Sequence, residues 1–182
     1  MTGQWPDEFR YQGIRYDLVG MSGSGLYTPM DFGMAPFSSC TACWRGYILR
    51  FDCVDDALIL DGMDINIREP ATINGVEPQV GQEHFKYTYS NIGLKTHYTG
   101  TILLAKDFIQ KIYVHMGFQR PMAYRTVIEL AIDDGNILEV RDLSARMAEM
   151  RKQDPTRGAH PKRPDDIEGW IEKTFSLDYE SE

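Results

Sequence analysis

Residues 124–141 read YRTVIELAIDDGNILEVR, and this stretch decides the fold that the sequence predicts. Apolar and polar residues alternate in its two outer runs, as they do in strands that bury one face. The DDGN sequence at 133–136 separates the runs, and its Asp-Gly pair supplies the positive φ angles that a tight hairpin turn requires. We therefore predict a β-hairpin with strands at 124–132 and 137–141.

The same alternation recurs upstream and extends the hairpin to a sheet. Further strands are predicted at 9–18 (around a turn at Gly13), 44–54, 57–67, 98–105 and 109–116. The segments 20–43 and 68–96 are rich in Gly, Pro and polar residues and are predicted loops, the second with either a short strand at 84–89 or a functional flap. The sequence thus predicts a mainly β (α+β) fold, with an antiparallel sheet or a partly open barrel or sandwich built of successive hairpins.

Two short helices are predicted near the end of the chain. The first runs from about Ser144, a good N-cap residue, to Lys152. The second begins at Asp165, where Glu168 follows at the spacing of a capping box. Its apolar residues fall at helical spacing and predict a stripe that packs on other structure, formed by Ile167, Trp170, Ile171 and Phe175.

These elements divide the chain into an antiparallel β domain at 1–143 and a helical appendage at 144–182. A polar, Pro-containing linker at 153–164 separates the two helices of the appendage. The apolar stripe of the second helix needs a surface to cover it. The appendage therefore packs either on its own domain or on a partner.

The composition excludes several classes of protein. Apolar residues make up 42% of the 182 residues, which is enough to build a core. No apolar run approaches the roughly 20 residues of a membrane helix, and the opening MTGQWPDEFRYQG lacks the pattern of a signal peptide, so we expect a cytoplasmic protein. The net charge of −8 argues against a nucleic-acid binder that relies on phosphate contacts.

Three segments carry a resemblance to a known family. The strings Cys43-Trp44-Arg45-Gly46-Tyr47, Tyr98-Thr99-Gly100-Thr101 and Tyr113-Val114-His115-Met116-Gly117-Phe118 resemble the WRGY and YVHMG-type strand motifs of a family of small bacterial proteins with no assigned function. The resemblance covers about residues 44–140, with a weaker match in the opening hairpin. It implies a bacterial, soluble, stand-alone protein, and it covers neither the Cys40-x-x-Cys43 pair nor the helical appendage.

The last strands hold the polar residues that suggest a site. If 109–116 and 124–132 pair antiparallel, a register exists in which His115 faces Arg125, Lys111 faces Glu129, and Tyr113 lies between them. His has a pKa suited to proton transfer near neutrality, so His115, Tyr113 and Glu129 are the candidate catalytic residues. The alternative is a solvated sheet face with one weak Lys–Glu pair.

Arg45 is unusual because its parity places it on the apolar face of the strand at 44–54. Its charged end either reaches out of the core, or is held by a carboxylate, or recognises a carboxylate on a ligand. Aromatic residues are favoured anchors at interfaces. The candidate binding residues are Arg45, Trp44, Arg125 and Tyr124.

Cys40 and Cys43 have the spacing of half a zinc site, and Cys53 is a third candidate ligand. The fourth ligand would be His84, His97 or His115. Because no second pair of cysteines exists, the alternative is small packed thiols in the reduced state, with no cofactor.

Two functions from different classes remain open. The first is a non-catalytic protein-binding module of a bacterial cell, such as an immunity-type protein that neutralises a toxin, because an acidic surface speeds association with a basic partner. The second is a small enzyme or ligand-binding barrel with its polar site around His115, Tyr113, Arg125 and Arg45. An open sheet edge would also allow pairing with a second copy of the chain.

Overall fold

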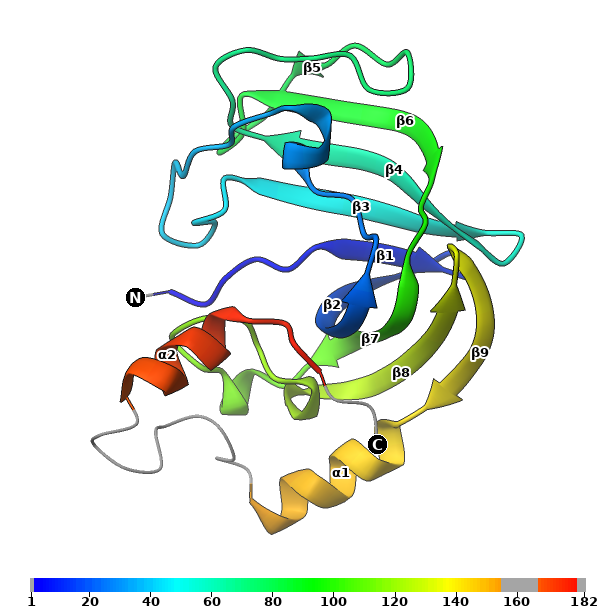
Figure 1. The fold of residues 1–182 in the computed structure, drawn as a ribbon. Helices are drawn as coiled ribbons and strands as arrows, with labels where there is room; N and C mark the ends of the chain where they lie inside the picture. Colours follow the sequence, from blue (N-terminus) through cyan, green and yellow to red (C-terminus); the bar gives the residue numbers. More distant parts are fainter. Residues whose placement is uncertain (1, 155–166, 180–182) are drawn as a thin grey trace.

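The computed structural model of this chain describes residues 2–154 and 167–179. Nine strands are described in one sheet of order β3-β1-β2-β7-β8-β9-β4-β6-β5, with an additional pairing of β3 with β4. The strands are β1 (Glu8–Tyr11), β2 (Ile14–Ser24), β3 (Tyr47–Val54), β4 (Ala57–Ile65), β5 (Gln79–Val80), β6 (Tyr87–Lys95), β7 (Thr99–Phe108), β8 (Tyr124–Asp133) and β9 (Asn136–Asp142). The predicted mainly β fold is confirmed (Figure 1).

The sheet curls into a barrel, because β3 and β4 link its two halves in the ring β3-β1-β2-β7-β8-β9-β4-β3. Successive hairpins supply most of the antiparallel pairs, as predicted. The pairing of β1 with β3 is parallel, since the chain returns to the same side through the long segment 25–46. The ring is weakest between β4 and β9, which share only the pair Ala57–Asn136.

The barrel interior is filled by side chains at alternate strand positions. On β3 the inward residues are Tyr47, Leu49 and Phe51, which are 8%, 2% and 2% exposed, as the period-two pattern predicts. The alternation at 124–132 predicts that the even positions of this strand face the core, and the structure confirms this. The inward residues of β8 are Ile128, Leu130 and Ile132.

A second apolar cluster covers the outer face of β7 and β8. Here Val19, Leu103 and Val127 pack with Met147 of α1 (Ser144–Gln153). The odd positions of β8 were predicted to lie on the non-core face, as either an open polar site or a solvated surface. They do lie outside the barrel core, yet Val127 and Glu129 are buried there. This correction follows from the appendage, because helix α1 lies against β8 and removes that part of the outer face from water.

The prediction of a strand at 109–116 is wrong. Strand β7 runs to Phe108, and the short 3-10 helices Gln110–Ile112 and Pro121–Ala123 follow before β8 begins. The reason lies in the pairing of β7, whose two edges are occupied by β2 and β8. Because β7 pairs directly with β8, the segment 109–116 cannot add a strand between them. The predicted register, in which His115 faces Arg125, is therefore also wrong.

The loop predicted at 68–96 contains a long strand. Strand β6 runs from Tyr87 to Lys95 and pairs with β4, whereas the sequence indicated only a short strand at 84–89. The small polar residues in β6 lie at exposed positions, for example Ser90 and Asn91. These residue types, which are common in loops, occur here because their positions on the strand are exposed to solvent.

Strand β2 likewise extends to Ser24, into the segment that its glycines predict to be a loop. Gly23 of β2 pairs with Gly100 of β7, and their φ angles are 141° and 146°. A Cβ on either residue would lie 2.2 or 2.0 Å from a backbone oxygen of the opposite strand. These glycines permit a close crossing of two strands instead of interrupting them.

The appendage folds back on the β domain. Helix α2 (Ile167–Phe175) lies on the side of the barrel where the N-terminal segment runs (Figure 1). The predicted linker 153–164 and the predicted helix start at Asp165 lie mostly outside the described residues. The 3-10 helix Pro29–Phe32 completes the described elements. Among the described helices none is long and apolar enough to span a membrane.

Candidate functional site

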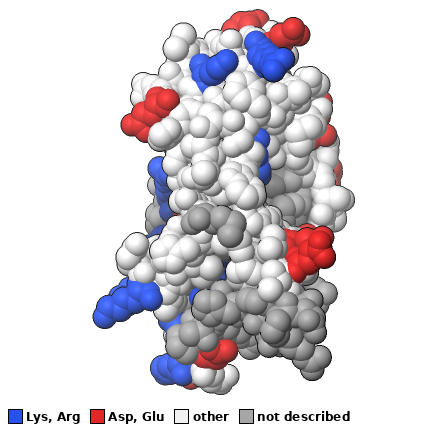
Figure 2. Space-filling view, turned by 90° about the vertical axis from the view of Figure 1, so that its left-hand side faces the viewer, with Lys and Arg blue, Asp and Glu red and all other residues white. Residues whose placement is uncertain are grey.

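Four segments and the end of α2 meet at one end of the barrel, and we call this surface the aromatic end. They are the N-terminal residues 2–6, the loop 37–47, the turn 84–86 and the loop 113–119, together with Thr174 and Phe175. The aromatic end contains Trp5, Phe37, Trp44, His84, Phe85, Tyr113, His115, Phe118 and Phe175. It lies on the left-hand side of Figure 1, which Figure 2 turns toward the viewer.

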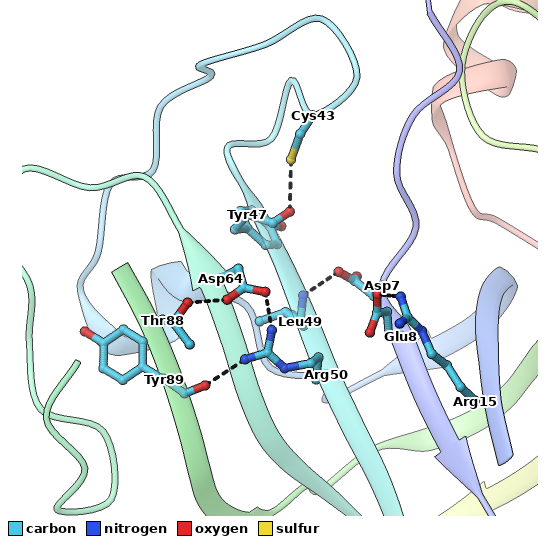
Figure 3. Close-up of polar contacts among 10 residues, drawn as sticks. All are labelled: Asp7, Glu8, Arg15, Cys43, Tyr47, Leu49, Arg50, Asp64, Thr88 and Tyr89. Carbon is cyan, nitrogen blue, oxygen red and sulfur yellow. Dashed lines mark hydrogen bonds and ion pairs between the residues drawn. The ribbon is translucent and has the colours of Figure 1, made fainter. Parts of the chain in front are cut away.

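The pair Arg45–Asp7 fixes the loop 37–47 to the N-terminal segment. The Arg45 guanidinium donates from both terminal nitrogens to the Asp7 carboxylate, at 2.9 and 3.1 Å. Asp7 also accepts the Leu49 amide at 2.8 Å, as Figure 3 shows. Burial lowers the pKa of Arg45, but the charge and hydrogen bonds of Asp7 outweigh burial and raise that pKa above its usual value. Of the three alternatives predicted for Arg45, the structure shows the one in which a carboxylate, that of Asp7, binds its guanidinium.

The same guanidinium also joins the loops 37–47 and 113–119. Its central carbon lies 4.8 Å from the ring centre of Tyr47 and 5.3 Å from that of Phe118. Both distances are those of cation–π contacts. The segments that carry the WRGY and YVHMG resemblance therefore meet around Arg45.

Backbone contacts position the aromatic side chains further. The buried Gln4 accepts the Trp44 amide at 3.0 Å and donates to the Thr41 carbonyl at 2.8 Å. The Gly3 amide donates to the Tyr113 hydroxyl at 2.8 Å. These bonds link segments about 40 and 110 residues apart in the chain, and they attach the Trp44 backbone and the Tyr113 hydroxyl to the N-terminal segment.

Ring contacts continue across this surface. Trp44 is 51% exposed and stacks on Phe175 of α2, with ring centres 5.0 Å apart. Trp5 lies 5.3 Å from the ring of His84. The exposed His115 meets Tyr113 edge-on at 4.9 Å. Among the described residues that Figure 2 shows on this face, charged side chains lie mainly toward the edges.

The structure brings together four of the candidate catalytic and binding residues that the sequence predicts. Trp44, Arg45, Tyr113 and His115 all lie in the aromatic end. Trp5 was missed, and His84 was named only as a possible zinc ligand. The sequence carries no signal that the N-terminal segment and the turn before β6 will meet there.

The other candidates lie elsewhere. Arg125 is exposed near Asp107, where its charge helps to lower the pKa of that carboxyl, after the larger effects of Thr126 and Lys106. Glu129 is buried and forms an ion pair with Arg141 of β9 instead of Lys111. Glu129 therefore has a structural partner on the outer face of the sheet.

Tyr124 belongs to a separate shallow hollow of about 290 Å³ between β2, β7 and β8. Its hydroxyl donates to Asp17 at 3.0 Å. Burial raises the pKa of Asp17, although the bond from Tyr124 acts in the opposite direction. The hollow is lined by Arg15, Tyr16, Asp17, Ala105, Lys106, Asp107, Phe108 and Tyr124. Asp17 was missed because its parity marks it as an outward residue of no special chemistry.

The cysteines do not assemble as the zinc hypothesis requires. Cys43 is buried with its thiol 3.3 Å from the Tyr47 carbonyl, whereas Cys53 lies at the opposite end of β3. An extended strand of that length separates its ends by roughly 20 Å. Burial raises the pKa of the Cys53 thiol to about 12 and also raises that of Cys43. Among the described residues no three His, Cys, Asp or Glu side chains are grouped to hold a metal ion.

A ladder of ion pairs crosses the outer face of β1, β2, β3 and β4. Arg15 pairs with Glu8, and Arg50 pairs with Asp64, which in turn accepts the Thr88 hydroxyl (Figure 3). A hollow of about 320 Å³ lies over this ladder. The arginines that line it each have a carboxylate partner, namely Arg10 with Asp52, Arg15 with Glu8 and Arg50 with Asp64. Mutual neutralisation leaves the ladder little attraction for an anionic ligand.

Comparison with protein-family models, with curated proteins and with solved structures found no match to this chain. The geometry described above is therefore the basis for assigning a function.

Proposed function

We propose that this protein is a non-catalytic protein-binding module and that the aromatic end is its contact surface. One observation carries the proposal. Trp44 is half exposed, yet its backbone and ring are both held, by Gln4 and by Phe175. A large apolar side chain that is exposed and already fixed loses little conformational freedom when a partner covers it.

The composition of the surface agrees with this role. The centres of protein interfaces are enriched in aromatic residues and depleted of charge, and Trp and Tyr are frequent binding hot spots. The described residues of the aromatic end include many aromatic side chains, and the charged side chains among the described residues lie mainly toward the edges of this face (Figure 2). The buried Arg45–Asp7 pair supports the surface from beneath and needs no ligand, since each partner satisfies the other.

The charge of the whole chain suggests the chemistry of the partner. A net charge of −8 accelerates association with a basic protein and slows association with an acidic one. An immunity-type neutraliser of a basic toxin in a bacterial cell would combine these features. The free thiols Cys40, Cys43 and Cys53 fit a reducing cytoplasm.

Affinity capture with matched variants tests the proposal. Tagged wild-type protein, Trp44→Ser and Val54→Ser would be expressed in the native host, and bound proteins identified by mass spectrometry. Val54 is the control because it is 48% exposed but lies at the far end of β3. Loss of a hot-spot residue costs about 2 kcal/mol, roughly thirtyfold in affinity.

We expect a stoichiometric basic partner with wild type and with Val54→Ser, and a large loss with Trp44→Ser. Thermal melting of each variant shows that it is folded. Capture of no partner, or equal capture by folded Trp44→Ser, would contradict the proposal.

A further inference from the structure

Strand β9 leaves one edge without a neighbouring strand over most of its length. On one side it pairs with β8 from Asn136 to Asp142. On the other side it pairs with β4 only at Asn136, and the Ile137 amide donates to the Asp56 carbonyl at 2.7 Å. Beyond Ile137, no strand of the described residues pairs with this edge, which lies at the right-hand flank of Figure 1.

The direction of the backbone at this edge follows from the pairing with β8. The Leu143 amide donates to the Val127 carbonyl at 2.8 Å, and antiparallel pairs alternate between bonded and non-bonded residues. Arg141 and Glu139 therefore bond to β8. The amide and carbonyl groups of Val140 point away from β8, toward the open edge.

Two apolar side chains lie beside these groups. Leu138 is 70% exposed and Val140 is 40% exposed. Natural sheets usually protect an open edge with proline, a bulge or inward-pointing charge, because free backbone groups next to apolar side chains invite another strand. The β-bulge at Leu138 interrupts the start of β9, while Val140 lies beyond it on regular strand.

We propose that β9 pairs antiparallel with β9 of a second copy of this chain, about a two-fold axis that passes through Val140. In this register Glu139 lies opposite Arg141 of the second copy, and the symmetry repeats that pair. Val140 meets Val140 of the second copy on the other face. The result is a sheet that continues from one molecule into the next.

Charge selects this register over its neighbours. A two-fold axis through Glu139 would place two glutamates opposite each other, and an axis through Arg141 would oppose two arginines. Like charges directly opposite across strands destabilise the pair, whereas opposite charges stabilise it. A single strand pair buries little area, so the dimer is weak and depends on protein concentration. It is also independent of the aromatic end, because it uses a different surface.

Cysteine cross-linking tests both the contact and its register. Bonded antiparallel residues have Cα atoms about 5.5 Å apart, within the range of about 4.4–6.8 Å that a disulfide spans. Val140→Cys therefore forms a covalent dimer when diamide is added at about 100 μM protein. Leu138→Cys is the matched control, because the two copies of residue 138 lie four residues apart in register, roughly 13 Å.

We expect V140C to give a strong covalent dimer band that L138C lacks. Wild type shows the background that its three native cysteines produce. Sedimentation equilibrium adds a measurement without cross-linking, in which Glu139→Arg weakens self-association by about tenfold or more because both ion pairs become repulsive. The proposal is overturned if wild type stays monomeric at every concentration, or if L138C cross-links as readily as V140C.

Discussion

At the residue scale, Asp17 is the side chain whose chemistry departs most from its sequence context. It sits beside Tyr124 in a shallow hollow, and burial raises its pKa in the folded state. A folded carboxyl with a raised pKa binds more protons than the unfolded one just above the ordinary Asp pKa. Folding stability therefore falls as the pH rises through the interval between the unfolded and folded pKa values.

Asp17→Asn should remove this dependence, since asparagine is neutral and its oxygen still accepts the Tyr124 hydroxyl. We expect the variant to gain stability relative to wild type as the pH rises from about 4 to 7. Urea unfolding at several pH values measures the difference. Asp107→Asn is the control with opposite sign and a different pH window, because hydrogen bonds from Thr126 and Lys106 lower the pKa of Asp107. Its stability relative to wild type should change below about pH 4 and stay constant from about 4 to 7. A pH-independent difference for Asp17→Asn would contradict the assignment.

At the scale of elements, we expect the Arg45–Asp7 pair to be a main anchor of the loop 37–47 on the barrel. Asp7→Asn leaves the Arg45 charge without its partner, and breaking a buried pair costs about 3–5 kcal/mol, less here because the Arg45 side chain is 25% exposed. Asp52→Asn removes the more exposed pair with Arg10 and should cost about 1 kcal/mol or less. Urea unfolding followed by Trp fluorescence compares them, and equal losses would show that the pair does not anchor the loop.

The elements also show what alternation can and cannot predict. Tyr47, Leu49 and Phe51 on β3 and the even residues of β8 were placed correctly, because a strand has only two faces. The pattern at 109–116 is similar, with Val114 and Met116 buried, yet that segment forms no strand. Pairing depends on which strand edges are free, and a local pattern contains no information about edges.

At the scale of the whole molecule, the aromatic end depends on closure of the barrel. The sequence marks Trp44, Arg45, Tyr113 and His115 separately, but their meeting requires the parallel return of β3 beside β1 and the docking of α2. These are contacts between segments distant in the chain. The fold class was therefore predictable from the sequence, whereas the surface that unites these residues was not.

Hydrogen exchange of the complex tests the central claim most directly. Exchange of the wild-type protein, alone and bound to the partner that affinity capture recovers, would be followed by mass spectrometry. We predict that binding slows exchange in residues 2–6, 37–47 and 113–119 and leaves β9 unchanged. The opposite result is that residues 2–6, 37–47 and 113–119 exchange as in the free protein, while binding protects either the ladder of ion pairs or β9. In that case the aromatic end is not the contact surface.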